Sequence, residues 1–330
     1  MTNFAVEMES RKALLIINPI SGTSHKEGIQ EKVEKRLGAE NIGVDTVWTT
    51  ASGDATRLAH KAVDDGYDIV VAAGGDGTIN ETATALCGSD TTLGIIPCGS
   101  GNGLARHLNI PVDISASIEI IGRGNALRCD RGSINGHPFF CTCGTGFDAT
   151  VSHKFAQSKK RGKLTYIKST LHEYLTYKPE EYVITTADGE VITERAFCVA
   201  VCNASQYGNN AYIAPHASIS DGLLDVTVIH YGNILTTALV GLDLMGGTIE
   251  KNMLVHTFRT NGLTIHRPKA EAVHLDGEPM NMDADLKIKC HPAELSIFAP
   301  GDDTPIRPLL TPITAMFNDI GIALRNIVKK

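Results

Sequence analysis

Residues 74–78 read Gly-Gly-Asp-Gly-Thr and directly follow the apolar run 68–73. That run lacks polar alternation, which predicts a short buried strand of a parallel sheet. The glycines let the backbone approach a ligand closely. Residues 79–86 predict a helix, whose first N–H groups would face the turn. The Asp76 carboxylate could hold a cation beside an anion, so this junction indicates a nucleotide phosphate with magnesium.

Two more glycine-bearing loops, 18–22 and 97–103, also follow predicted strands, at 12–18 and 92–96. Ligands of parallel sheets bind at the carboxyl ends of the strands, so we expect all three loops to converge on one ligand. The plainer alternatives are a proline turn at 18–22 and a helix cap at Asn102. The lysine-bearing phosphate loop Gly-x-x-x-x-Gly-Lys-Ser/Thr does not occur in the sequence.

The elements that would position these loops alternate along the first third of the chain. Helices are predicted at 26–37 and 54–63, and a further strand at 44–48, which indicates a parallel α/β sheet. We therefore assign residues 1–125 to an α/β nucleotide-binding domain.

The pattern changes near residue 125 to closely spaced strands. Asn135-Gly136 and Asp188-Gly189 are hairpin signals. We assign residues 126–305 to an all-β domain, predicted to be a β-sandwich. Helices are predicted at 164–177, 232–245 and 313–329, and the tail 306–330 is expected to pack back on the first domain. The strands are expected at 127–134, 138–143, 182–187, 191–195, 197–203, 223–230, 263–267, 272–275, 286–290 and 295–299.

Composition excludes several classes of protein. The 330 residues carry a net charge of -7, which argues against a nucleic-acid partner. No apolar run is long enough to span a bilayer, and the N-terminus carries no secretory signal, so we expect a cytoplasmic protein. The eight cysteines include no Cys-x-x-Cys pair, which argues against zinc and predicts buried free thiols.

Six motifs occur in one order along the chain, and together they resemble the diacylglycerol kinase catalytic-domain family, which is more distantly similar to sphingosine kinases. They are Asn18-Pro19-x-Ser21-Gly22, Gly74-Gly75-Asp76-Gly77-Thr78, Pro97-x-Gly99-Ser100-Gly101-Asn102, Gly144-x-Gly146-Phe147-Asp148-Ala149, Asp221-Gly222-x-Leu224-Asp225 and Asp276-Gly277-Glu278. The resemblance implies a nucleotide-binding α/β domain followed by a β-sandwich, with the active site in the cleft between them. It also implies transfer of the γ-phosphoryl group of ATP to a lipid hydroxyl, with Mg2+.

The resemblance also assigns roles to residues. Asp276 resembles the general base, assisted by Glu278, and Asp221 with Leu223 resembles the anchor of a bound magnesium. Asp76 is expected at both the nucleotide and the metal. The ATP-binding set implied in this way is Asn18, Pro19, Ser21, Gly22, Thr49, Gly74, Gly75, Asp76, Gly77, Thr78, Gly99, Ser100, Gly101, Asn102 and Arg161.

Two of these motifs also have simpler structural interpretations. Asp276-Gly277 alone predicts an ordinary hairpin turn. Residues 144–149 formally fit a dinucleotide-binding pattern, but they follow a hairpin, and no acid stands about twenty residues further on. A turn that shapes the cleft wall, with Asp148 lining it, is the favoured interpretation.

Two departures from the family pattern leave the acceptor open. Gly103 stands where many bacterial diacylglycerol kinases carry an aspartate, and Thr150 stands where sphingosine kinases tend to place an acid. The alternatives are therefore diacylglycerol, a sphingoid base, NAD as in the NAD kinases, or a non-catalytic lipid-binding module. The expected partner is a lipid at the inner membrane surface, where the protein would be peripheral. The oligomeric state stays open, with a homodimer among the alternatives.

Overall fold

The computed structural model describes residues 11–20, 26, 28–150 and 177–301, which form two compact units. The first unit runs to Cys129 and includes residues 294–302, and the second contains residues 130–293. The helices predicted at 164–177 and 313–329 lie outside the described residues, apart from Tyr177, as does the tail 306–330.

The first unit is built on a parallel sheet, as its uninterrupted apolar runs predict. Its strand order is β2-β1-β3-β4, and the end of a long strand, β15, pairs in parallel with β4. Strands β3 and β4 are buried along their whole length. The bounds are β1 (Lys12–Ile17), β2 (Gly43–Trp48), β3 (Ile69–Gly74), β4 (Thr92–Pro97) and β15 (Asp285–Phe298).

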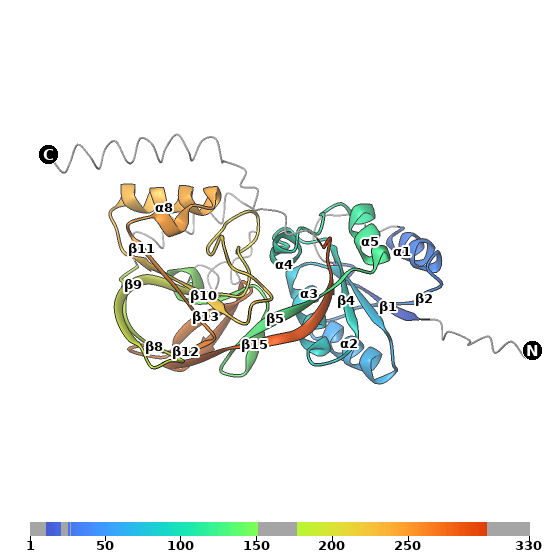
Figure 1. The fold of residues 1–330 in the computed structure, drawn as a ribbon, viewed down its shortest axis with the longest axis horizontal. Helices are drawn as coiled ribbons and strands as arrows, with labels where there is room; N and C mark the ends of the chain where they lie inside the picture. Colours follow the sequence, from blue (N-terminus) through green and yellow to red (C-terminus); the bar gives the residue numbers. More distant parts are fainter. Residues whose placement is uncertain (1–10, 21–25, 27, 151–176, 302–330) are drawn as a thin grey trace, which may run out of the picture. The chain divides into compact units, whose positions relative to one another are not determined.

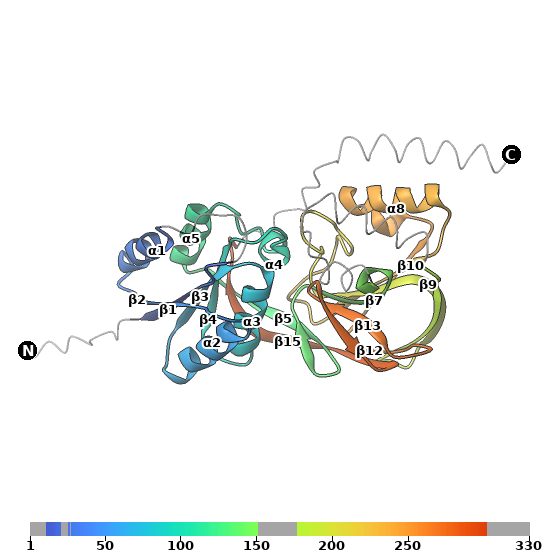
Figure 2. The same cartoon turned by 180° about the vertical axis from the view of Figure 1, so that it is seen from behind.

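Helices cover both faces of this sheet (Figures 1 and 2). On one face, α1 and α5 share a buried cluster with the sheet that includes Leu15, Val33 and Ile121, while α2 and α3 pack together on the other face. Helix α3 begins at Asp76, three residues before the predicted start, because extended Gly75 precedes it and the acid suits a first turn. The bounds are α1 (Ile29–Gly38), α2 (Asp54–Asp64), α3 (Asp76–Leu86), α4 (Gly103–His107) and α5 (Ile114–Arg123).

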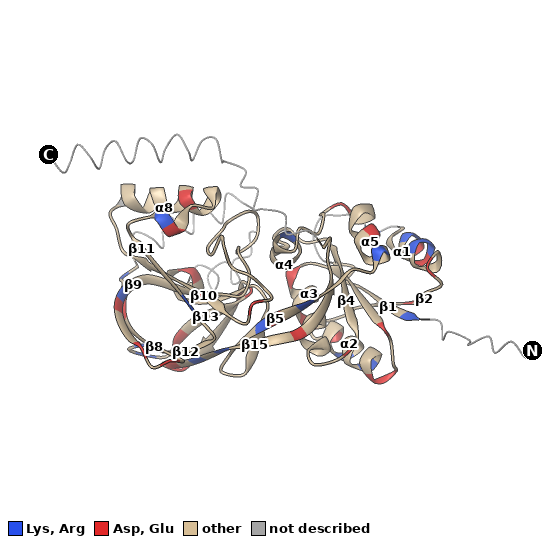
Figure 3. Ribbon diagram, in the orientation of Figure 1, with Lys and Arg blue, Asp and Glu red and all other residues tan. Residues whose placement is uncertain are grey.

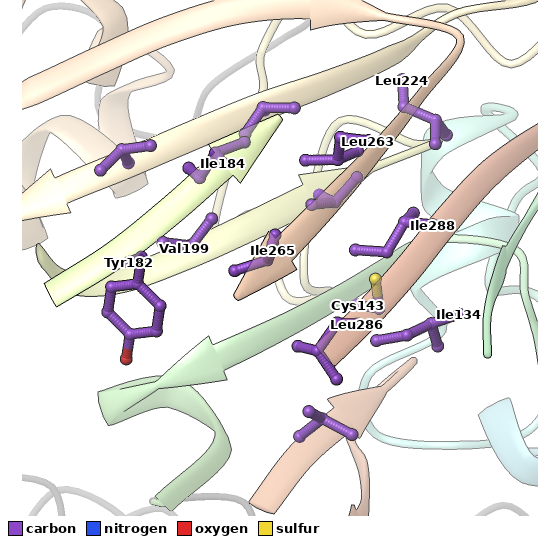
Figure 4. Packing of buried hydrophobic residues seen from close by; sticks show 14 of the residues in the cluster. Ile134, Cys143, Tyr182, Ile184, Val199, Leu224, Leu263, Ile265, Leu286 and Ile288 are labelled. Carbon is purple, nitrogen blue, oxygen red and sulfur yellow. The ribbon is translucent and has the colours of Figure 1, made fainter. Parts of the chain in front are cut away.

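The second unit is an antiparallel β-structure, as predicted. Strand β9 organises it, because its first half pairs with β8 and its second half pairs with both β7 and β10. Ile184, Val199, Leu263 and Ile288 meet in its core (Figure 4). The bounds are β5 (Ala126–Ile134), β6 (His137–Phe139), β7 (Thr142–Gly146), β8 (Glu180–Thr186), β9 (Val191–Cys202), β10 (Leu224–His230), α8 (Ile234–Gly246), η1 (Ile249–Lys251), β11 (Val255–Thr260), β12 (Gly262–His266), β13 (Glu271–Leu275) and β14 (Glu278–Met282).

Two pairs of predicted strands are single strands in the structure. The segments 191–195 and 197–203 are both in β9, and 286–290 and 295–299 are both in β15. The interruption in β15 marks a change of partner, from antiparallel β12 to parallel β4. The backbone at Ala293 has a φ of 52° there, so the polar stretch between the apolar runs is a distorted strand rather than a loop.

Two-residue turns with positive φ close two hairpins. The predicted Asn135-Gly136 hairpin is confirmed, with φ values of 48° and 86° between β5 and β6. Asp276-Gly277 closes β13 and β14 in the same way, with φ values of 50° and 89°. Such turns require residues that tolerate the left-handed region, which Asn, Asp and Gly do.

Candidate active site

The carboxyl ends of β1, β3 and β4 bring the three glycine-bearing loops together, as the sequence predicted. The backbone N–H of Asn18 donates to the Ala73 carbonyl at 3.0 Å, and that of Cys98 donates to the Gly74 carbonyl at 2.7 Å. The strand order reverses direction between β1 and β3, and ligands bind at such a switch point in open α/β sheets.

Asp76 links two of these loops from the first turn of α3. Its Oδ2 accepts a hydrogen bond from the backbone N–H of Asn102 at 2.9 Å, and its Oδ1 accepts one from Gly103 at 2.7 Å. A Cβ on Gly101 would lie 2.8 Å from Asp76 Oδ2, so only glycine fits beside this carboxylate. Each carboxylate oxygen retains a lone pair that can meet a cation.

Asn102 closes its own loop instead of capping the next helix with its side chain. Its Oδ1 accepts from the Gly99 N–H at 3.0 Å, and its Nδ2 donates to the Gly99 carbonyl at 2.8 Å. Asn102 is still the N-cap residue of α4, and its carbonyl accepts from the Arg106 N–H at 2.9 Å. Asn102 has a left-handed backbone, with a φ of 52°. The first N–H of α4, that of Gly103, donates to the Asp76 carboxylate.

Asn18 and Thr78 join the remaining pair of loops. The Asn18 Nδ2 donates to the Thr78 Oγ1 at 2.9 Å, and its Oδ1 accepts from the Ile20 N–H at 3.1 Å. A Cβ on Gly74 would lie 2.5 Å from the Thr78 Cβ, so this glycine is needed for the turn. Pro19 is exposed beside them.

The other predicted ATP-binding residues fall into three groups. Gly75 occupies the N-cap position of α3 and Gly77 lies in its first turn. Ser100 is exposed at the tip of the loop after β4. Ser21, Gly22 and Arg161 lie outside the described residues.

Lys26 is a charged residue at this site that sequence reasoning missed. Its Nζ donates to the backbone carbonyl of Asn18. Burial lowers the pKa of Lys26, and the nearby Cys98 thiol partly opposes that shift. The sequence analysis gave Lys26 only as the first residue of the helix predicted at 26–37, and its only signal was its position four residues after the Asn18–Gly22 motif.

Thr49 is buried at the carboxyl end of β2, next to β1. Its backbone N–H donates to the Ile17 carbonyl at 3.0 Å. The loop that follows is shaped by two carboxylates. Asp54 accepts from the Thr50 hydroxyl at 2.7 Å, and this hydrogen bond is the main cause of the lowered pKa of Asp54. Glu81 accepts from the Gly53 N–H at 2.9 Å.

Asp276 lies in the second unit, and it does more than close a hairpin. Its Oδ2 accepts from the Phe140 N–H at 2.8 Å, and its Oδ1 accepts from Cys141 at 2.7 Å and Thr142 at 2.9 Å. Three backbone donors therefore hold both oxygens in place. Glu278 is exposed two residues further on.

Asp148 belongs to a buried polar cluster that also contains two residues the sequence analysis missed. Its Oδ2 accepts from the Tyr207 hydroxyl at 3.0 Å and lies 3.0 Å from His274 Nε2. A Cβ on Gly144 would lie 2.4 Å from the same oxygen. Burial, followed by the Asp148 charge, raises the pKa of Tyr207. Whether Asp148 lines a substrate cleft stays a prediction.

Comparisons with known proteins agree with this geometry. Residues 12–134 match the model of the diacylglycerol kinase catalytic domain, and residues 141–299 match that of the YegS C-terminal NAD kinase beta sandwich-like domain. The protein named "Probable lipid kinase YegS" from Escherichia fergusonii is 30% identical over 88% of this chain and 96% of its own length. The chain belongs to the diacylglycerol kinase catalytic-domain family.

One further relative and one solved structure are similar to this chain. The diacylglycerol kinase of Bacillus subtilis is 29% identical over 81% of this chain and 90% of its own length. The crystal structure of a diacylglycerol kinase from Bacillus anthracis superposes with a TM-score of 0.71 at 21% identity, and it covers 89% of this chain and 99% of that one. The likeness to that structure shows the fold alone.

Asp221 and Asp225 are the carboxylates nearest along the chain to the magnesium position that the family resemblance implies at residues 221 and 223. Asp221 accepts from Arg259 Nη2 and from the Leu223 N–H at 3.1 Å, and Arg259 Nε lies 3.3 Å from Asp225. Asp225 Oδ2 is buried without a partner among the described residues. This all-oxygen pair of carboxylates suits a hard cation, although Arg259 now supplies the positive charge.

The first unit offers a different kind of metal position. No group of three or more His, Cys, Asp or Glu side chains that could hold a metal occurs in the described part of the chain. Mg2+ in phosphoryl-transfer sites usually uses one or two carboxylates, with water and substrate phosphates as the other ligands. Asp76 alone at the converging loops therefore fits a metal that arrives with a nucleotide.

The cysteines and helices bear on two other sequence expectations. All eight cysteines are free, and six of them are buried. Cys141 precedes β7 and Cys143 lies within it, so the strand predicted at 138–143 is in fact two, β6 and β7. None of the described helices is both long and apolar enough to cross a bilayer.

Proposed function

We propose that this family member is an ATP- and Mg2+-dependent kinase that transfers the γ-phosphoryl group to a hydroxyl of diacylglycerol or a related lipid. The observation that carries the proposal is the position of Asp76, in the first turn of α3 and bonded to residues 102 and 103 where the strand-end loops converge. The names of the relatives support a lipid acceptor.

The chemistry of the first unit follows from its donors. The first N–H groups of α3 and the positive end of its dipole favour an anion at the turn. Lys26, whose ammonium is partly desolvated, adds a positive charge next to Asn18. A bound magnesium would neutralise charge on the transferred phosphoryl group, and Asp76 would help to hold it.

Asp276 is the proposed base for the acceptor hydroxyl. Its carboxylate accepts three backbone N–H groups, so its orientation does not need to be set when the substrate arrives. An ionised carboxylate held in this way can act as the acceptor of the hydroxyl proton. Glu278 is proposed to assist at the same turn.

Labelled ATP tests the proposal directly. The purified protein is incubated with total lipid extract, then with dioleoylglycerol, sphingosine and NAD in parallel, with Mg2+ or with EDTA. We expect label in a glycerolipid product and none with EDTA. Label in NADP would replace the proposal with NAD kinase, and label in a sphingoid phosphate would change the acceptor. No transfer to any acceptor would support a non-catalytic lipid-binding module.

A further inference from the structure

Large apolar side chains gather on the outside of the second unit at α8. Ten large hydrophobic residues are exposed in the described part of the chain, and four of them lie within residues 231–253. Leu235 is 75% exposed, Leu239 is 45% exposed and Met253 is 71% exposed. The two leucines are four residues apart, so they share one face of the helix. Met253 lies two residues after η1, which contacts α8, and we call Leu235, Leu239 and Met253 the α8 surface.

This exposure does not come from a poorly held helix. Asn233 caps α8, because its Oδ1 accepts from the N–H groups of Leu235 at 3.0 Å and Thr236 at 2.9 Å. On the inner side, Val240 is buried in a cluster with residues of β9 and β10. Helix α8 lies against the strands of the second unit (Figure 1), with Val240 buried and Leu235 and Leu239 exposed.

The α8 surface is also free of charge. Asp243 is the only charged residue of α8, whose ribbon is otherwise tan in Figure 3. Its carboxylate accepts from the Thr248 hydroxyl at 2.9 Å and from Asn252 Nδ2 at 2.6 Å, so it is occupied by the segment that follows the helix. Exposed Glu250 and Lys251 are adjacent in that segment, so together they add no net charge.

A second copy of the chain is a poor occupant for this surface. Stable protein interfaces need about 20–30 residues on each side, whereas the α8 surface has three large apolar side chains. A lipid bilayer needs no complementary partner surface, because the strength of interfacial binding scales with the apolar area that is buried among the lipid chains. The substrate of a lipid kinase also lies in a bilayer.

We propose that α8 docks this protein on the membrane, with Leu235, Leu239 and Met253 inserted among the lipid chains. The inference rests on the proposed function, since it explains how the enzyme reaches a lipid acceptor. Docking brings the second unit to the bilayer through a rigid helix rather than through a spanning segment.

Vesicle binding tests this proposal without ATP. The probe is large unilamellar vesicles of dioleoylphosphatidylcholine and dioleoylphosphatidylglycerol, with dioleoylglycerol included. The variant L235A/L239A should partition onto them roughly 30-fold more weakly than wild type, because most of the inserted carbon atoms are removed. The control is V191A, which alters a side chain that is 62% exposed on the same unit but away from α8.

A second measurement uses the single tryptophan of the chain, Trp48. In W48F/L235W the only indole is on α8, and its emission should shift to the blue when vesicles are added. In W48F/V191W the emission should not move. Equal vesicle binding by L235A/L239A and wild type, or an unshifted L235W emission, overturns the proposal. So does a dimer that dissociates in L235A/L239A while vesicle binding persists.

The two proposals can fail separately. A protein that binds vesicles through α8 but transfers no phosphoryl group leaves the docking surface intact and removes the kinase. Conversely, a kinase whose L235A/L239A variant keeps vesicle binding and full activity on vesicle-embedded dioleoylglycerol retains its function but docks elsewhere.

Discussion

Replacing Asp276 with Asn separates the structural role of this carboxylate from its proposed chemistry. The asparagine keeps one carbonyl oxygen, so the two bonds from Cys141 and Thr142 can persist, while the bond from Phe140 to Oδ2 meets an NH2 group instead. A lost hydrogen bond to a charged acceptor costs about 1.5–3 kcal/mol. Asn also tolerates the φ of 50° at this position, so we expect no added backbone strain.

The expected result is a folded protein that is destabilised by about 2 kcal/mol and nearly inactive. General base catalysis contributes about 100-fold to 10,000-fold, so kcat should fall by at least about 100-fold. Nucleotide binding should persist, because the loops proposed to hold ATP lie in the first unit. Urea unfolding, initial rates with labelled ATP and titration with a fluorescent nucleotide measure the three quantities.

A matched control is Asp188→Asn, which makes the same change in the Asp-Gly turn between β8 and β9. Asp188 accepts from the Thr186 hydroxyl within its own hairpin, and this bond is the main cause of its lowered pKa. D188N should keep the wild-type rate. A wild-type rate in D276N refutes the base assignment, and unchanged stability in D276N refutes the energetic argument from the three N–H donors.

Three further predictions concern the first unit. Gly101→Ala places a Cβ 2.8 Å from Asp76 Oδ2. Nucleotide affinity, measured by calorimetry, should therefore fall at least about tenfold, and the free energy of unfolding, measured by denaturation, should fall by about 1–3 kcal/mol. The control is Gly38→Ala, whose Cβ meets nothing within 4 Å and which should change neither quantity. Lys26→Gln should weaken ATP binding about tenfold. The unfolding midpoint should stay unchanged or rise slightly, because burial disfavours the ammonium charge of Lys26. A lower midpoint with unchanged ATP affinity would mean that Lys26 serves the fold alone. Burial lowers the pKa of His107 from 6.5 to about 4. Between pH 6.5 and pH 4 the unfolded chain therefore binds a proton at this histidine that the folded chain does not bind. The free energy of unfolding should fall across this range by at most about 3 kcal/mol. Urea unfolding of wild type and His107→Gln between these pH values measures this slope, and an equal slope in both contradicts the assignment.

The architecture of the first unit could be predicted because its signals are local. Uninterrupted apolar runs mark buried parallel strands, and glycines mark the turns where those strands end. The same reasoning put the loops after β1, β3 and β4 at one edge, where the structure places them. It did not foresee that the Asn102 side chain bonds to Gly99, because the direction of that side chain depends on a left-handed backbone that no residue pattern predicts.

The sequence by itself determined the carboxyl ends of β1, β3 and β4, their glycine turns and the family, because these depend on residues that are neighbours along the chain. Tertiary structure alone decided the partners of the polar groups. Asp276 accepts from N–H groups that are separated from it by 134, 135 and 136 positions along the chain. His274 contacts Asp148, and these two residues are 126 positions apart. Hydrophobic periodicity specifies which face of a strand is buried, but it does not specify strand register or which buried donors a carboxylate reaches. Those contacts exist only once the sheets have packed.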